Sequence, residues 1–196
     1  MKRFGLMLCG AVLSALTAQA EEPSLRFGVL GDVHIDQRHF GEPGGGSSVG
    51  KFRRALRYFD SRAADGVVIC GDLTHDGGIA ELKRLEATWR EVFPDGRRSD
   101  GGRIERLFAF GDHDVEKPFW YMKYQPNALK NPKLIADMTT NHIAYVDRAK
   151  VWKDVFGEDF APVMRKTVKG YDFVLAHLVN ADEDGLRYAD PLHIPG

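Results

Sequence analysis

A Gly-Asp pair follows each of three separate apolar segments, at Asp32, Asp72 and Asp112. The three segments span residues 25–30, 66–70 and 106–110. They are short, rich in Val, Ile, Leu and Phe, and lack strict alternation, which is typical of strands covered on both faces. The aspartates recur at intervals of 40 residues. The repetition predicts three equivalent strands whose carboxyl ends carry acidic residues.

Two segments with apolar residues at helical spacing separate the three strands. The first is 51–64, with Phe52, Leu56, Phe59 and Ala63, and the second is 79–93, with Leu82, Leu85, Trp89 and Phe93. Alternation of strand and helix predicts a parallel sheet with right-handed crossovers. In that architecture all carboxyl ends lie along one edge, so Asp32, Asp72 and Asp112 are expected to meet there.

The later part of the chain carries weaker signals. Residues 117–141 contain three prolines, and they are expected to form a long connection, a partly helical cap over the sheet edge, or a plain surface excursion. A helix is expected at 147–156. Residues 163–178 are expected to form a hairpin with Lys169 and Gly170 in the turn.

Ionisable residues cluster immediately after the strands. They are Asp32, His34, Asp72, Asp112, His113 and Asp114. Carboxylates and imidazoles on rigid strand ends suit divalent Mn, Fe or Zn, and a carboxylate between two such groups can bridge two ions. Two ions about 3.5–4 Å apart can clamp the attacking and leaving oxygens of a phosphoryl transfer. The residue types therefore predict a centre for two divalent metal ions.

The order of these motifs resembles the calcineurin-like metallophosphoesterase family. The family pattern is Asp-x-His, Gly-Asp, and Gly-Asn-His followed by Asp or Glu, and the resemblance covers residues 25–180. It implies an α/β fold of two packed mixed β-sheets flanked by helices, the αββα sandwich of metallophosphoesterases. It also implies an enzyme, a phosphoric ester hydrolase acting on a phosphomonoester or a phosphodiester.

The resemblance assigns four residues to the metals. Asp32 and His34 would bind the first ion, and Asp72 would bridge both ions. Asp112 stands where the family has an Asn that binds the second ion and touches the phosphate.

The resemblance assigns catalysis to the next two residues. His113 matches a histidine that contacts phosphate and protonates the leaving oxygen, and Asp114 would orient its ring. An imidazole paired with a carboxylate has a raised pKa and a fixed tautomer, as a proton donor needs. Hydrolysis would use metal-activated water, with the ions polarising the phosphoryl oxygens.

Later family histidines, a lone His and a Gly-His-x-His, have no matching counterpart in this sequence. We therefore expect a domain that is incomplete at its C-terminus. His177 and His193 are the remaining candidates for additional metal ligands, together with His142. The alternative for each is an ordinary strand or surface histidine.

The second departure from the family pattern is Asp112 in place of Asn. An ionised carboxylate only accepts hydrogen bonds and adds a charge beside an anionic substrate, whereas an amide also donates. Weaker phosphate binding or tighter metal binding is expected. The alternative function is a non-catalytic, exported module that retains the fold and binds a metal or a partner.

The first twenty residues resemble a signal peptide, which leaves 21–196 as the metallophosphoesterase domain. Lys2 and Arg3 precede an apolar run at 4–16 that is too short to span a bilayer, and Ala18-Gln19-Ala20 supplies a cleavage pattern. We expect export to a periplasmic or extracellular location. Lipid attachment at Cys9 is disfavoured because Leu8 precedes it.

The remaining composition gives no sign of a nucleic-acid-binding protein. Without the signal the chain carries 25 basic and 28 acidic side chains, which does not indicate nucleic-acid binding. Cys70 lacks an intrachain partner once Cys9 is removed, and it is expected in the core. His39 and His75 are expected on solvated loops. No feature specifies an oligomeric state.

Overall fold

The computed structural model describes residues 25–40, 47–115, 125, 127 and 130–177. The expected signal peptide and His193 lie outside these residues, as does part of the expected connection at 117–141. Within the described part, no helix has the length and apolar character needed to cross a membrane.

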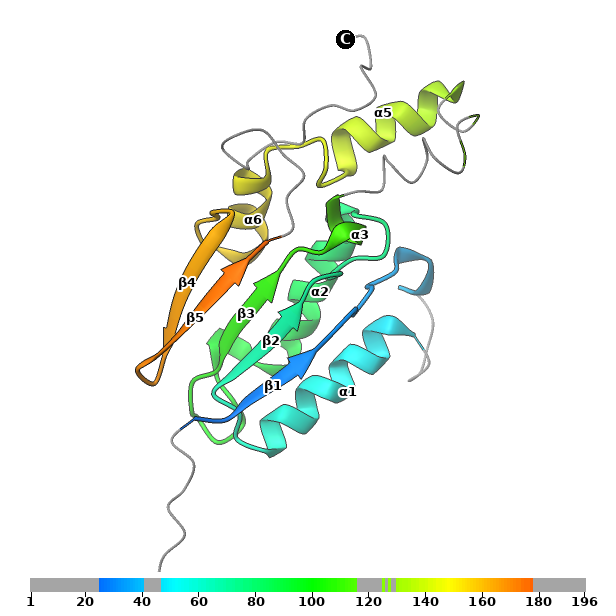
Figure 1. Cartoon of the computed structure of the whole chain (residues 1–196). Helices are drawn as coiled ribbons and strands as arrows, with labels where there is room; N and C mark the ends of the chain where they lie inside the picture. Colours follow the sequence, from blue (N-terminus) through cyan, green and yellow to red (C-terminus); the bar gives the residue numbers. More distant parts are fainter. Residues whose placement is uncertain (1–24, 41–46, 116–124, 126, 128–129, 178–196) are drawn as a thin grey trace, which may run out of the picture.

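Three parallel strands form the central sheet, as the repeated strand endings predict. They are β1 (Phe27–Leu30), β2 (Gly66–Cys70) and β3 (Glu105–Ala109), hydrogen-bonded in the order β1-β2-β3. Figure 1 shows their arrowheads pointing to the same end of the molecule. That end is the carboxyl edge, where the short helix α3 (Asp112–Val115) begins.

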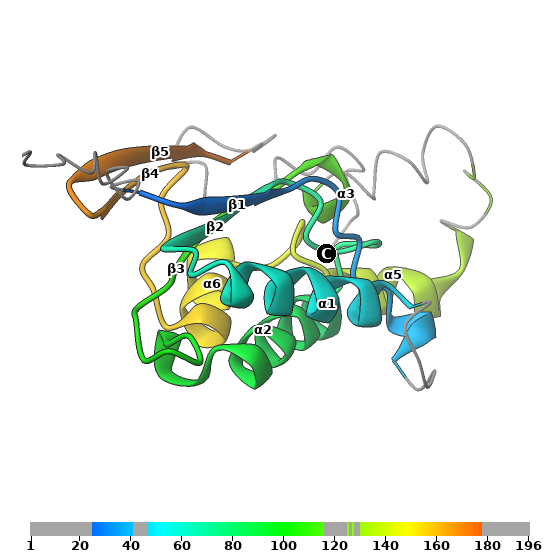
Figure 2. The same ribbon diagram turned by 90° about the horizontal axis from the view of Figure 1, so that it is seen from below.

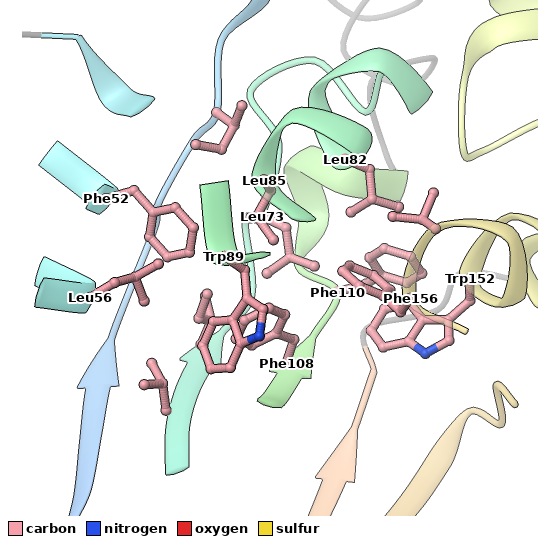
Figure 3. Packing of buried hydrophobic residues seen from close by; sticks show 14 of the residues in the cluster. Phe52, Leu56, Leu73, Leu82, Leu85, Trp89, Phe108, Phe110, Trp152 and Phe156 are labelled. Atoms are coloured by element: carbon pink, nitrogen blue, oxygen red, sulfur yellow. The ribbon is translucent and has the colours of Figure 1, made fainter. Parts of the chain in front are cut away.

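Three helices cover one face of this sheet, as the view from below in Figure 2 shows. They are α1 (Ser48–Ser61), α2 (Ile79–Val92) and α6 (Arg148–Phe156). Helix α1 starts earlier than expected because the Ser47 side chain caps it by accepting a hydrogen bond from the N–H of Gly50 (3.1 Å). The helices and the sheet share the main core, drawn in Figure 3, in which Trp89 packs edge-on against Phe108.

The expected hairpin is confirmed as β4 (Val163–Val168) and β5 (Tyr171–Ala176). Lys169 and Gly170 have φ of 49° and 82°, the left-handed pair that a two-residue hairpin turn requires. A second core cluster joins this antiparallel sheet to the parallel one through Leu107, Val168 and Leu175. The described chain therefore has the expected α/β class, with a parallel and an antiparallel sheet flanked by helices.

The expectation that all three strands are covered on both faces is wrong for β1. Phe27 and Val29 are 49% and 56% exposed, although Gly28 between them is buried against Phe59. Phe27 and Val29 point away from the helices, toward the side where the hairpin packs on Leu107 and Val68, and there the rings of Phe27 and Phe173 meet edge-on.

The remaining elements are short. They are the 3-10 helices η1 (Gln37–His39) and η2 (Pro94–Gly96), and the helix α5 (Pro132–Asn141). Helix α5 shows that the later half of the expected connection is helical, with Asn131 as its N-cap. Figure 1 places α5 on the same side as α3, beyond the carboxyl edge of the sheet.

Candidate active site

The acidic residues that follow the strands lie together at the carboxyl edge. The nearest ligand atoms of Asp32, His34 and Asp72 all lie within 4.8 Å of one another. The charge of Asp112 acts on the carboxyl of Asp72, and both residues line the same cavity. The strand order thus brings the three Gly-Asp motifs to one place, and their roles as metal ligands remain a prediction.

The backbone at this edge is strained. Asp32, His34 and Asp72 have φ of 46°, 45° and 51°, a left-handed conformation that costs a non-glycine residue on the order of 1 kcal/mol. The loops after β1 and β2 hold each other in place through hydrogen bonds from His34 N–H to the Asp72 carbonyl (2.9 Å) and from Ile35 N–H to the Leu73 carbonyl (3.1 Å). Strained backbone of this kind persists only where the surrounding structure enforces it, and it is found most often at functional sites.

The structure explains why the third Gly-Asp motif needs a glycine at position 111. A Cβ at this position would lie 2.3 Å from Oδ1 of Asp72, which no side chain tolerates. The next turn then closes over Asp72, because the N–H of His113 donates to the same oxygen (3.1 Å). The motif therefore needs glycine so that the third loop can approach the aspartate of the second.

The electrostatics of Asp72 favour a bound cation. Burial raises the pKa of its carboxyl, the hydrogen bond from His113 N–H lowers it, and the negative charge of Asp112 raises it further. His34 Nε2 lies 3.5 Å from Asp72 Oδ2, while the buried Nδ1 of His34 has no hydrogen-bond partner among the described residues. Crowded carboxylates beside an unpartnered imidazole nitrogen fit a divalent metal ion.

Asp114 has a different role from the one expected. It is fully buried and accepts hydrogen bonds from Leu73 N–H (3.1 Å), from Thr74 N–H and Oγ1 (2.8 and 2.6 Å), and from Gly111 N–H (2.8 Å). Burial raises its pKa to about 6. This carboxyl therefore joins the second loop to the third.

The expected pairing of Asp114 with His113 is wrong. His113 Nδ1 lies 2.7 Å from the carbonyl oxygen of His75, which can only accept, so Nδ1 carries the proton. Consecutive residues of a helix point about 100° apart, and α3 begins at Asp112, so the two side chains face different ways. The Nε2 atom of His113 is left to accept, donate or ligate.

Glu81 is a residue that the sequence interpretation missed. It is fully buried at the start of α2 and accepts hydrogen bonds from the N–H groups of Gln37 (3.0 Å), Asp76 (3.0 Å) and Gly78 (3.3 Å). Burial raises its pKa despite these bonds. Its position three residues after the N-cap Gly78 is the capping-box spacing, which could have signalled the cap but not the reach to Gln37.

His75 is not the independent solvated residue that was expected. Ligand atoms of His34, His75 and His113 lie within 4.8 Å of one another. The rings of His34 and His113 are 4.4 Å apart between centroids, and those of His75 and His113 are 5.7 Å apart. Three imidazoles from three loops therefore meet at the carboxyl edge.

His177 lies outside this cluster. Its Nδ1 accepts from the N–H of Phe110 (3.0 Å), and its Nε2 faces the Met164 sulfur (3.2 Å). Burial lowers its pKa to about 4, with a smaller contribution from the charge of Lys166, so the ring is neutral at pH 7. Both ring nitrogens are occupied, which disfavours the expected ligand role. His142 is likewise buried, with Nδ1 accepting from Ala144 N–H (3.2 Å).

A cavity of about 600 Å³ adjoins the carboxylates. It lies between the ends of β2 and β3 and the strand β5, with Asp32, Asp72 and Asp112 on one side. Cys70 lines this cavity and is exposed, which corrects its expected place in the core. Side chains alternate along a strand, so Ile69 faces the helices and Cys70 faces the cavity.

The sequence of the chain matches the family model described as calcineurin-like phosphoesterase over residues 25–189. This match covers most of the chain, which belongs to that family. No curated protein sequence gives a significant match. Family membership indicates metal-dependent hydrolysis of phosphoesters, and the groups of His and Asp described above could hold a metal.

Proposed function

We propose that this calcineurin-like phosphoesterase hydrolyses a phosphomonoester or a phosphodiester at the carboxyl edge of its parallel sheet, with two divalent cations bound there. One observation carries the proposal: Asp32, His34 and Asp72 present ligand atoms within 4.8 Å of one another, on strained backbone, beside a cavity that can admit a substrate.

Four residues would hold the cations. Asp32 and His34 would bind one ion, Asp112 would bind the second, and Asp72 would be shared by both. When bound, Mn, Fe or Zn ions supply positive charge to the phosphoryl oxygens and make water more acidic. The carboxyl of Asp72, whose pKa is raised by burial and by the neighbouring Asp112, would then gain a compensating positive charge beyond that of the nearby histidines.

His113 would act on the leaving group. Its Nδ1–H donates to the His75 carbonyl, so the ring is anchored and a proton held at Nε2 can pass to the departing oxygen. Asp114 supports this by holding the Gly111 and Thr74 backbones, which fixes the start of α3. Asp114 is therefore a positioning residue in this proposal.

The decisive experiment uses purified chain stripped of metal and reloaded with Mn²⁺ or Zn²⁺. Hydrolysis of an aryl phosphate and of a bis-aryl phosphate is measured for the unmodified protein, Asp72→Asn and Asp159→Asn. We expect Asp72→Asn to lower kcat on the order of 1000-fold or more, the scale of losing one key electrostatic group. Asp159, 93% exposed beside Lys153, is the matched control and should leave kcat unchanged.

A second candidate is a non-catalytic module that binds a metal or a partner. Asp112 favours it, because a carboxylate where the family has an amide repels an anionic substrate. Absence of hydrolysis on both substrates, in protein shown by metal analysis to hold two ions, would establish this alternative and end the catalytic proposal.

Export to the periplasm or the extracellular space is proposed from residues 1–20 alone. The basic start, the apolar run and Ala18-Gln19-Ala20 support cleavage before Glu21. N-terminal sequencing of protein recovered from the producing cells should begin at Glu21, and an intact Met1 terminus on the mature protein would contradict export.

A further inference from the structure

Three histidines gather at the carboxyl edge, each from the segment that follows a different strand. His34 follows β1, His75 follows β2, and His113 lies in α3 after β3. One nitrogen of each lies within 4.8 Å of the others. We propose that His34, His75 and His113 form an all-imidazole site for a nitrogen-preferring transition ion such as Cu²⁺, and that its occupation blocks hydrolysis at the adjoining carboxylate centre.

The chemistry of the ligands separates the two sites. Three neutral imidazoles suit Cu²⁺, Zn²⁺ and Ni²⁺, whereas the set of Asp32, His34 and Asp72 also accommodates Mn²⁺. Imidazole–zinc bonds of about 2.0–2.1 Å place two ligand nitrogens of a tetrahedral site about 3.3 Å apart. Small ring rotations can close the observed spacing, because the His34 and His75 side chains are about one third exposed.

The ring of His113 already makes the hydrogen bond that is typical of a ligating histidine. A ligating histidine usually donates its second N–H to a carbonyl or a carboxylate, which fixes the tautomer and leaves the other nitrogen to bind the metal. His113 does this through its contact with the His75 carbonyl (2.7 Å). His34 has a buried Nδ1 with no hydrogen-bond partner in the described part of the chain, so a ligand for this nitrogen would satisfy it.

Two shared residues make the imidazole site inhibitory, and this step rests on the proposed function. His34 belongs to both groups, so an ion that draws it toward His75 and His113 weakens the carboxylate centre. A ligated His113 also cannot hold the proton for the leaving group. Copper bound at the imidazole site would therefore stop the hydrolysis that Mn²⁺ supports at the carboxylate centre.

The test uses Cu²⁺ as the probe on the full chain, followed by electron paramagnetic resonance and by competition with a chelator of known affinity. The unmodified protein should show three coupled imidazole nitrogens. His75→Ala should show two, and its affinity for Cu²⁺ should fall on the order of 100-fold. The substitution keeps the backbone carbonyl that anchors His113, so it removes the ligand and not the anchor.

Asp32→Asn is the matched control, since it removes a ligand of the carboxylate centre only. Asp32→Asn should lose Mn²⁺ affinity and keep the three-nitrogen Cu²⁺ signal. His75→Ala should keep Mn²⁺ affinity and lose one nitrogen from the Cu²⁺ signal. If His75→Ala fails to fold, as judged by circular dichroism, His75→Gln replaces it. Unchanged Cu²⁺ affinity and nitrogen count in a folded His75 variant would overturn the proposal.

Activity gives a second readout that separates the two proposals. Micromolar Cu²⁺ should inhibit the Mn²⁺-loaded protein, and His75→Ala should resist the same concentration. Equal inhibition of both proteins would contradict the inhibitory role. If the Mn²⁺-loaded protein hydrolyses neither substrate, the proposed function fails. The spectroscopic test still decides whether the three histidines bind Cu²⁺.

Discussion

The two ends of strand β2 carry aspartates of similar burial and opposite electrostatics. Asp65, just before the strand, is 6% exposed, and Asp72, just after it, is 8% exposed. Burial alone would raise the pKa of Asp65, but Arg26 N–H, Lys169 and Arg98 together lower it. Burial raises the pKa of Asp72, and Asp112 adds to the effect.

The difference lies in where cationic side chains are placed. At the amino end of the sheet Asp65 contacts Lys169 (2.9 Å) and Arg98 (3.3 Å), so its charge is compensated within the chain. At the carboxyl edge the described carboxylates Asp72 and Asp114 are held mainly by neutral hydrogen-bond donors. One end is therefore built for stability, and the other keeps negative charge available for a cation.

The largest expected effect tests how the carboxyl edge is held together. Each carboxylate oxygen of Asp114 accepts two hydrogen bonds, so the NH₂ group of Asp114→Asn replaces two buried hydrogen bonds at whichever position it takes. We expect a loss of about 4 kcal/mol in the free energy of unfolding. Urea denaturation of the metal-free protein measures it, and Asp159→Asn, at an exposed position, should change little.

The next effect tests the compensated end. Asp65→Asn leaves Arg98 and Lys169 without their buried partner and should destabilise the fold by about 3 kcal/mol in the same denaturation assay. Asp100→Asn provides the matched control, since Asp100 also pairs with Arg98 but is half-exposed, and a change below about 1 kcal/mol is expected. Equal losses of stability for Asp65→Asn and Asp100→Asn would show that the buried ion pairs of Asp65 do not stabilise the amino end of the sheet.

The pH dependence of stability tests a third case, His177, which is buried as a neutral ring rather than as a compensated charge like Asp65. The pKa of His177 falls to about 4 in the folded protein, chiefly through burial, so the unfolded chain binds a proton that the native one rejects. Its contribution to stability is present above about pH 6.5 and is lost as the pH falls toward 4. We expect about 2 kcal/mol less stability at pH 5 than at pH 7 from this group.

His177→Gln tests that assignment, because an amide can still accept from Phe110 N–H without titrating. Metal-free denaturation at both pH values should show a smaller loss for this variant than for the unmodified protein. The same pH dependence in both proteins would assign the loss to other groups.

Local sequence signals were enough to predict the framework of the site. The apolar segments, the helical spacing and the Gly-Asp repeats place Asp32, Asp72 and Asp112 at one edge, as the structure has them. These features depend on residues near in sequence and on the regular geometry of parallel sheets. The hairpin turn at Lys169 and Gly170 was also predictable, because it too depends on residues that are neighbours in the sequence.

Contacts between distant loops could not be predicted in the same way. Glu81 reaches Gln37 across 44 residues, and His113 is anchored by a backbone carbonyl, which no residue type reveals. Glu86 of α2 is buried and paired with Arg90 and with Arg106 of β3. Such partners depend on how helices and loops pack, so the sequence alone left them open.

The smallest expected change in stability concerns Asp112, where the carboxyl edge and the amino end of the sheet should respond with opposite signs. In the metal-free protein Asp112→Asn removes one of two like charges, which should lower the pKa of Asp72 and raise the free energy of unfolding by about 1 kcal/mol. The same change at the compensated end, Asp65→Asn, should have the opposite sign. Urea denaturation in the presence of a chelator measures both.

The substrate provides the second measurement on this variant. An amide at position 112 no longer repels a phosphate and can donate to it, so KM for an aryl phosphate should fall several-fold. Weaker retention of the second ion is expected at the same time, because a charged ligand is lost, and metal analysis after dialysis would show it. If stability and KM both stay unchanged, the charge of Asp112 is already neutralised, and the carboxyl edge is less different from the amino end than the geometry indicates.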